Sequence, residues 1–206
     1  MVNRLKANFF DVEVGSEWSS KDYGSKELEK VGRIFEAANL SDGDMVLEPG
    51  CGSGRLTRLI AQTIGGEGRV MAAEISSKML DQARLRVQGL TNVTLVLGAV
   101  EDVTSEWGIF DVVLCHNVFP HFDDKQRALS ILVQALRDGG RFIVSHFMSS
   151  SEVNSLHRKT NPAVAHDFLP DHDQMKKLFE SSGMFVEYIS DDEKGYLLKA
   201  LRTIHS

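Results

Sequence analysis

The sequence predicts an α/β protein with a seven-stranded, mostly parallel sheet and helices on both faces of that sheet. Short apolar runs alternate with segments of helical periodicity, which is typical of repeated βαβ units. No internal repeat or low-complexity segment interrupts this alternation. The chain has 206 residues, of which 42% are hydrophobic and 25% charged, so we expect a single domain over residues 1–206.

Seven apolar runs are the expected strands. Runs of this length and composition indicate strands, and the last two form a closing pair. The expected strands are Met45–Glu48, Arg69–Glu74, Val93–Leu97, Phe110–Cys115, Arg141–His146, Met184–Ser190 and Gly195–Arg202.

Between the strands, apolar residues recur at helical spacing and predict helices that cover the sheet. One of these helices is expected to begin at Asp123, with Gln126 completing a capping box, and to stop at Gly139 and Gly140. The others are expected over Leu28–Ala38, Leu56–Ile64, Met79–Val87 and around Met175–Phe179, the last ending at Gly183.

Two stretches lie outside this alternation: the leader over residues 1–24 and the polar segment 147–170. Ligands in open α/β sheets bind beyond the carboxyl ends of the strands, where such excursions collect. Both stretches are therefore candidate lids over a site, and their alternative interpretation is surface connection.

A glycine-rich turn carries the functional prediction. Met45 to Leu56 reads MVLEPGCGSGRL, an apolar strand followed by Glu48, three alternate glycines and the start of a helix. Glycine lets the backbone approach a ligand closely, and the helix N-terminus offers free N–H groups. Glu74 ends the next strand twenty residues after Gly54, at the spacing where a carboxylate accepts hydrogen bonds from ribose hydroxyls. The sequence therefore predicts a nucleotide-like ligand on a Rossmann-like sheet.

The spacing of the glycines separates the possible nucleotides. A dinucleotide-binding turn has a final Gly or Ala where this chain has Arg55, and no Gly-Lys-Ser/Thr of a phosphate loop is present. The G-x-G-x-G spacing after an acidic residue resembles the class I S-adenosylmethionine-dependent methyltransferases, of the small-molecule type similar to the ubiquinone and menaquinone group. Later segments in the expected order, LVLGAVEDV, FDVVLCHNVFPHF and LRDGGRFIVSHF, extend the resemblance from about Ser25 to the end.

The resemblance implies a binding role for each part of the motif. Glu48 and the glycine loop would hold the methionine part of S-adenosylmethionine, and Glu74 would hold the ribose. Ile75 would cover one adenine face, while His116 and Asn117 would lie near the transferable methyl group. The loop and the adenine edge add Gly50, Cys51, Gly52, Gly54, Ala99, Val100 and Glu101 to the cofactor-binding set. Where many relatives have Gly-Asp-Ala, this chain has Gly98, Ala99 and Val100, so the usual acceptor for the adenine amino group is absent.

Several histidines follow the fourth and fifth strands, where an acceptor would meet the methyl group. His116, His121 and His146 are the candidate catalytic residues, because histidine suits deprotonation of an amine, phenol or thiol near neutral pH. Neutral imidazole also binds metals, so a divalent metal site from His121, His146 and His157 stays open. The His-x4-His spacing of His116 and His121 matches no zinc signature.

Composition restricts partners and location. A net charge of −6 without a long Lys/Arg block argues against nucleic acid as substrate and favours a small-molecule acceptor. The first residues lack the apolar stretch of a signal peptide, no window is apolar enough for a membrane span, and Cys51 and Cys115 suit reduced thiols. We therefore expect a cytoplasmic monomer or homodimer without membrane attachment.

The leading functional hypothesis is S-adenosylmethionine-dependent methyl transfer to a small acceptor by in-line displacement. One alternative is a non-catalytic S-adenosylmethionine- or metal-binding protein on the same scaffold, because function lies in the site and not in the fold. The other is a nicotinamide-dependent dehydrogenase, which Arg55 argues against.

Overall fold

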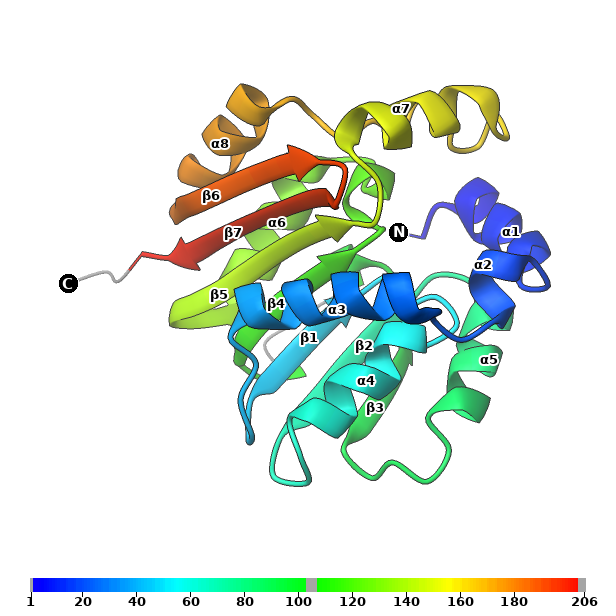
Figure 1. Ribbon diagram of the computed structural model, residues 1–206, viewed down its shortest axis with the longest axis horizontal. Helices are drawn as coiled ribbons and strands as arrows, with labels where there is room; N and C mark the ends of the chain where they lie inside the picture. Colours follow the sequence, from blue (N-terminus) through cyan, green and yellow to red (C-terminus); the bar gives the residue numbers. More distant parts are fainter. Residues whose placement is uncertain (1, 103–106, 204–206) are drawn as a thin grey trace.

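The structure, a computed structural model, describes residues 2–102 and 107–203 and is built around one seven-stranded sheet (Figure 1). The strand order is β3-β2-β1-β4-β5-β7-β6. All neighbouring pairs are parallel except β5 with β7 and β6 with β7, which are antiparallel. The predicted fold class, a Rossmann-like sheet that is mostly parallel and covered by helices, is confirmed.

All seven predicted strands are present, and three have the predicted bounds. The strands are β1 Met45–Pro49, β2 Arg69–Glu74, β3 Val93–Leu97, β4 Phe110–His116, β5 Leu136–His146, β6 Met184–Asp192 and β7 Gly195–Arg202. The largest difference is at β5, which begins at Leu136 and not at Arg141. Leu136 pairs with Phe110, and the register then shifts around Gly139, which has a φ of 70°. The two glycines expected to end a helix therefore shape an irregular strand.

The helices that cover the sheet lie where their periodicity predicts. They are α3 Ser25–Ala38, α4 Arg55–Thr63, α5 Ser77–Arg86, α6 Lys125–Ala135 and α8 His172–Glu180. The N-cap of α6, expected at Asp123, lies one residue later in the structure. Asp124 is the N-cap and accepts a hydrogen bond from Arg127 N at 2.9 Å. Asp123 instead pairs with Lys6 near the N-terminus.

Alternating side chains of the strands separate two apolar layers. On β1, Val46 faces the layer formed with α3 and α4, whereas Leu47 faces the layer formed with α6 and α8. Ile143 and Phe142 divide in the same way on β5. Because both faces of the central strands are buried, these strands read as continuous apolar runs in the sequence.

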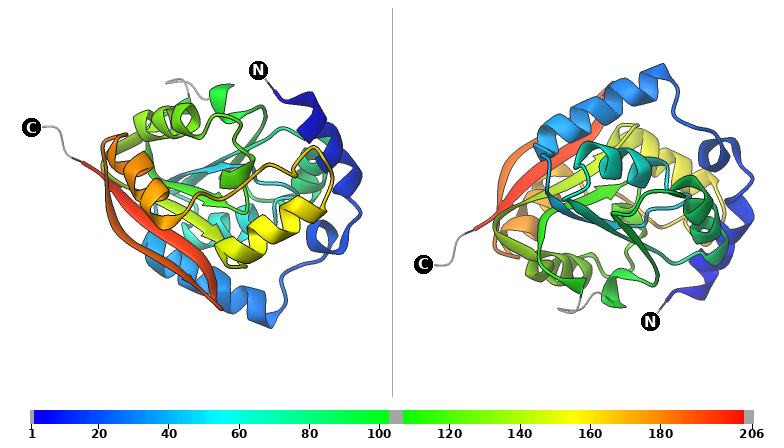
Figure 2. Two further views of the ribbon diagram at one scale, coloured as in Figure 1. Left: turned by 90° about the horizontal axis from the view of Figure 1, so that it is seen from above. Right: turned by 90° about the horizontal axis from the view of Figure 1, so that it is seen from below.

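The leader and the segment after β5 contain helices that the periodicity did not predict. They are α1 Arg4–Glu13, α2 Glu17–Ser20 and α7 Ser150–Lys159. Both Figure 1 and the two views of Figure 2 show α1, α2 and α7 together at the carboxyl end of the parallel strands. The excursions therefore gather where a Rossmann-like sheet binds its ligands.

Candidate cofactor and acceptor site

A cavity of about 540 Å³ lies at the carboxyl ends of β1, β2, β4 and β5. The loops that follow these strands line the side of the cavity next to the sheet. The leader and the segment after β5 also contribute lining residues: Phe9, Phe10, Trp18 and Tyr23 from the leader, and Val153, Leu156 and Val164 from the segment after β5. The cavity is thus enclosed by both segments that the sequence singled out as lids.

The glycine loop forms one wall of this cavity. Gly50, Gly52 and Gly54 have φ values of 70°, 54° and 77°, a left-handed conformation that glycine adopts without a steric penalty. The amides of Gly50 and Cys51 donate to Ala73 O at 2.7 and 3.0 Å, which fixes the loop on β2. A Cβ on Gly50 would lie 2.2 Å from Cγ2 of Val118, so this position also needs glycine for space.

Glu74 joins this loop to the next one. Its Oε2 accepts from Gly52 N at 2.9 Å, and its Oε1 accepts from Ser76 N at 2.9 Å. Burial raises the pKa of the Glu74 carboxyl, and these backbone donors partly oppose that shift. The side chain lines the cavity, where sequence spacing had placed a ribose-binding carboxylate.

Glu48 is a buried carboxyl with an unsatisfied atom. Its Oε2 has no hydrogen-bond partner among the described residues, and the side chain lines the cavity next to the loop. Burial, together with the nearby Glu74, raises the pKa of Glu48 to about 8. A buried polar atom without a partner indicates a ligand group, and a cationic amine would satisfy this one.

The residues expected to contact adenine line the cavity, and position 99 is an alanine where many relatives have an acidic residue. Ile75, Ala99, Val100 and Glu101 line the cavity, the last two within the 3-10 helix η1 Val100–Asp102. The Asp102 carboxylate accepts from Ala99 N at 2.9 Å and so serves as a local cap. Glu101 is the acidic side chain that faces the cavity from this segment.

His116 is held at both ring nitrogens at the end of β4. Nδ1 lies 3.0 Å from Ser145 Oγ, and Nε2 lies 3.0 Å from Asn117 Nδ2. Burial and the Arg55 charge lower the pKa of His116 to about 3. The ring is therefore neutral and already hydrogen-bonded, which suits a positioning role better than proton transfer. Asn117 beside it has a φ of 54° and also lines the cavity.

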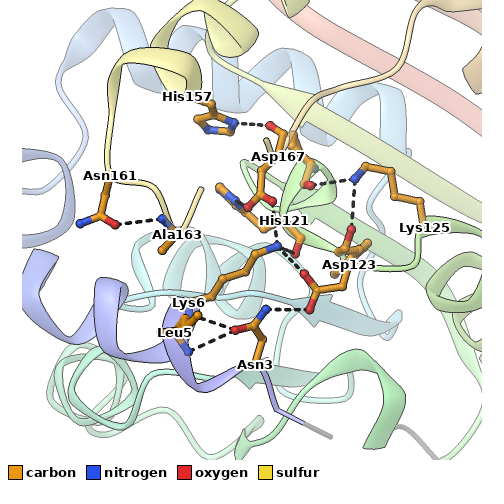
Figure 3. Close-up of polar contacts among 12 residues, drawn as sticks. Asn3, Leu5, Lys6, His121, Asp123, Lys125, His157, Asn161, Ala163 and Asp167 are labelled. Carbon is orange, nitrogen blue, oxygen red and sulfur yellow. Dashed lines mark hydrogen bonds and ion pairs between the residues drawn. The ribbon is translucent and has the colours of Figure 1, made fainter. Parts of the chain in front are cut away.

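His121 has a different environment, in the 3-10 helix η3 Phe119–His121. Its Nδ1 donates to Asp167 Oδ2 at 2.8 Å, which leaves Nε2 as the acceptor nitrogen of the ring. Burial lowers the pKa of His121, and Asp167 partly offsets the shift. His121 is thus a neutral imidazole on the cavity wall with an oriented ring (Figure 3).

The remaining candidate histidines also reach the cavity. His146 is buried, its Nε2 has no partner among the described residues, and burial lowers its pKa well below the usual value. His157 on α7 bonds the Asp167 carbonyl, and its ring centroid is 4.8 Å from that of His121. In the described part of the chain, however, no three His, Cys, Asp or Glu side chains are arranged to hold a metal. Both His146 and His157 line the cavity.

Two residues of the site were missed by sequence reasoning. Lys6 is buried although it lies in the leader, and it contacts both Asp123 and Asp167. Asp167 lies in the excursion that was singled out only as a lid. Neither belongs to a motif, and a lysine in a polar leader usually indicates a solvated face, so no local signal could have found them.

The fold and the loop define a class before any relative is considered. A Rossmann-like sheet with a glycine loop after β1 and an acidic residue at the end of β2 is a nucleoside-binding architecture. The seven-stranded order, with β7 antiparallel between β5 and β6, agrees with the fold that the resemblance drawn from the motifs implied.

Comparison with known proteins gives the family. Residues 40–193 match the model of a methyltransferase domain, so the chain belongs to this methyltransferase family. It is 32% identical over 160 residues to a ubiquinone/menaquinone biosynthesis C-methyltransferase of Vibrio parahaemolyticus, covering 76% of this chain and 60% of the relative. An Idiomarina loihiensis protein of the same name is 27% identical, with 72% and 69% covered. The resemblance to class I S-adenosylmethionine-dependent methyltransferases is confirmed.

One further relative matches part of the sequence, and two solved structures share the fold at low sequence identity. An uncharacterized 37.1 kDa protein of a Streptomyces fradiae transposon is 31% identical over 54% of this chain, which spans 32% of that protein. Magnesium protoporphyrin IX methyltransferase of Synechocystis with bound S-adenosylhomocysteine aligns with a TM-score of 0.73, 18% identity, and 97% and 99% coverage. A methyltransferase of Aquifex aeolicus aligns at 0.70, with 16% identity and 98% and 100% coverage.

The curated relatives are longer than the matched region. The chain spans from 32% to 69% of the lengths of the three relatives described above. Across residues 2–102 and 107–203, no helix of the structure has the length and apolar content needed to cross a membrane.

Proposed function

We propose that this chain uses S-adenosylmethionine to methylate a small, uncharged acceptor and that His121 is the general base. The observation that carries the proposal is one cavity that joins a nucleoside-binding loop to an oriented, neutral histidine. Arg55, which takes the place of the last small residue in a dinucleotide-binding turn, favours this cofactor over a nicotinamide.

The residues present fit S-adenosylmethionine. Glu48 supplies a buried carboxyl without a partner for the amino group of the methionine part. Glu74 has its carboxylate at the end of β2 for the ribose hydroxyls, and Ile75 with Val100 supplies apolar contact for the adenine. The bound cofactor supplies a methyl group on a positively charged sulfur.

The chain's own chemistry is then positioning and proton transfer. His121 Nε2 accepts the proton of the acceptor's X–H group while the X–C bond forms and the S–C bond breaks. His121 would keep that proton on its imidazole, and the cofactor would take the electrons of the broken S–C bond to become a neutral thioether, so atoms and charge balance. Asn117 and His116, locked together by their hydrogen bond, keep the wall beside the reacting atoms rigid.

The lining supports an uncharged acceptor. The two strong cations in the described lining are engaged, Lys6 by two carboxylates and Arg55 by Glu27 and the Tyr23 ring. Little positive charge is left for an anionic acceptor. Phe10, Phe122 and Leu156 add apolar surface, so a largely apolar molecule with one ionisable O–H, N–H or S–H fits best.

Calorimetry with S-adenosylmethionine and S-adenosylhomocysteine tests the cofactor half of the proposal. We expect micromolar binding that weakens at least about tenfold in Glu74→Ala, because one ribose hydrogen-bond partner is lost. Glu67→Ala removes an exposed acidic residue outside the cavity and serves as the matched control. Absence of binding to either nucleoside would overturn the proposal.

Release of S-adenosylhomocysteine in the presence of a panel of phenols, thiols and azoles tests the chemical half. His121→Ala should lower turnover of any accepted compound by about a hundredfold or more while nucleoside binding is kept. His166→Ala removes a histidine that does not line the cavity and should leave turnover unchanged. Equal loss in both variants would contradict the assignment of His121.

A further inference from the structure

We propose that Asp167 positions His121 and that Lys6 makes this positioning conditional on the docking of helix α1. The inference rests on the proposed role of His121. The leader would then act as a closing strap that completes the base as it closes the cavity. Three segments meet in this contact: α1, η3 and the loop after α7 (Figure 3).

Asp167 is shared between the histidine and the lysine. Its Oδ2 accepts from His121 Nδ1 at 2.8 Å, and its Oδ1 lies 2.8 Å from Lys6 Nζ. One carboxylate oxygen therefore fixes the ring and the tautomer, while the other is held by a cation. Although burial opposes ionisation, the hydrogen bonds from His121 and Lys6 lower the pKa of Asp167.

Lys6 also binds the backbone of His121 and the side chain of Asp123, two residues further along the chain. Its Nζ donates to the carbonyl of His121 at 2.8 Å and to Asp123 Oδ1 at 2.7 Å. Asn3 Nδ2 adds a donor to Asp123 Oδ2 at 2.9 Å. Lys6 thus contacts both His121 and Asp167, the carboxylate that orients the His121 ring.

The burial pattern of α1 shows what docks this helix. Lys6 is the buried residue of α1, at 5% exposure, whereas Leu5 and Val12 are 74% and 79% exposed. A surface helix normally buries its apolar side chains and exposes its lysines. In α1 the fully buried side chain is instead a lysine, while Phe9 and Phe10 are half-buried at the cavity. The helix is therefore docked largely by polar contacts, those of Lys6 and the hydrogen bonds that Asp11 accepts from Ser76 and Lys78, with Phe10 packing edge-on against His121 at 5.2 Å between ring centroids.

The consequence is a coupling between access to the cavity and the reactivity of His121. With α1 undocked, the cavity loses Phe9 and Phe10 from its wall and Asp167 loses its cation. Asp167 is then free to leave the His121 ring, and the Nδ1–H tautomer is no longer enforced. The base would be assembled when the leader closes over bound molecules, which also excludes water from the reacting atoms.

The test measures the His121 tautomer and the docking of α1 separately, in the full chain with S-adenosylhomocysteine bound and absent. Nitrogen-15 NMR reports which ring nitrogen carries the proton, and hydrogen exchange reports protection of the α1 amides. Lys6→Met is compared with Arg4→Met, which removes a charge from an exposed position of the same helix. Asp167→Asn is compared with Asp123→Asn, which contacts Lys6 but not the His121 ring.

We expect wild-type His121 to be protonated at Nδ1. Lys6→Met should raise α1 exchange by about tenfold or more and give mixed tautomers, whereas Arg4→Met should change neither. Asp167→Asn should alter the tautomer, and Asp123→Asn should leave it in place. Lys6→Gln, which keeps a donor without the charge, is the second variant should Lys6→Met not fold.

An unchanged His121 tautomer in both the Lys6 and the Asp167 variants would overturn the inference, as would an equal effect of Arg4→Met. These readouts do not depend on turnover. Failure of the wild-type protein to bind S-adenosylhomocysteine would instead count against the proposed function, so the two failures are distinguishable.

Discussion

Binding of the cofactor product should be linked to ionisation of Glu48. The carboxyl is buried next to the glycine loop with a pKa of about 8, so it is protonated at neutral pH before a ligand arrives. The amino group of S-adenosylhomocysteine pairs with the ionised form. Binding must therefore release a proton, and affinity must rise with pH below the pKa.

The size of the effect follows from that pKa. With one proton released, the dissociation constant should fall about 30-fold between about pH 5.5 and pH 7.0. Calorimetry in two buffers of different ionisation enthalpy should show close to one proton released per site at the acid end. In Glu48→Gln the pH dependence should disappear and affinity should be low throughout. A wild-type affinity that stays flat over this range, without proton release, would refute the reasoning.

Three other predictions concern stability and the loop. Because the raised pKa of Glu48 favours the protonated folded form, stability of the ligand-free protein should fall as pH rises from about 4.5 to about 8, at most about 1.4 kcal/mol per pH unit. Glu48→Gln should remove that slope in denaturant titrations. Gly50→Ala, which forces a Cβ against Val118 at a φ of 70°, should cost about 1–3 kcal/mol and weaken nucleoside binding, whereas Gly32→Ala in α3 should stabilise by up to about 1 kcal/mol. Phe179→Ala, in the layer between α8 and the sheet, should lower the free energy of unfolding by about 3–5 kcal/mol, and a loss below 1 kcal/mol would contradict the packing described.

The leader illustrates where sequence reasoning ended. Its position outside the strand and helix alternation predicted a lid, and the structure encloses the cavity with it. Its helices were not predicted, because α1 exposes Leu5 and Val12, turns Phe9 and Phe10 toward the cavity and fully buries only Lys6 among its residues. A periodicity argument finds helices that are held by hydrophobic burial, and α1 is held by hydrogen bonds and ion pairs.

The histidines illustrate the same limit within the site. Sequence position placed His116, His121 and His146 at one edge of the sheet, and all three line the cavity. Their hydrogen-bond partners differ: two side chains for His116, one carboxylate for His121 and, among the described residues, none at Nε2 of His146. That a residue is histidine sets which chemistry is available, and its neighbours in the folded structure decide which ring keeps a free acceptor nitrogen.

The sequence by itself determined the sheet, the covering helices and the nucleoside loop of this protein. These features depend on period-2 and period-3.6 patterns and on glycines at fixed spacing, all of which act over neighbouring residues. Tertiary structure alone decided that Lys6, His121 and Asp167 meet, since these residues lie on three segments far apart in the chain. It also decided the ionisation of Glu48 and His116, because a pKa depends on burial and on charges that only the folded chain brings near.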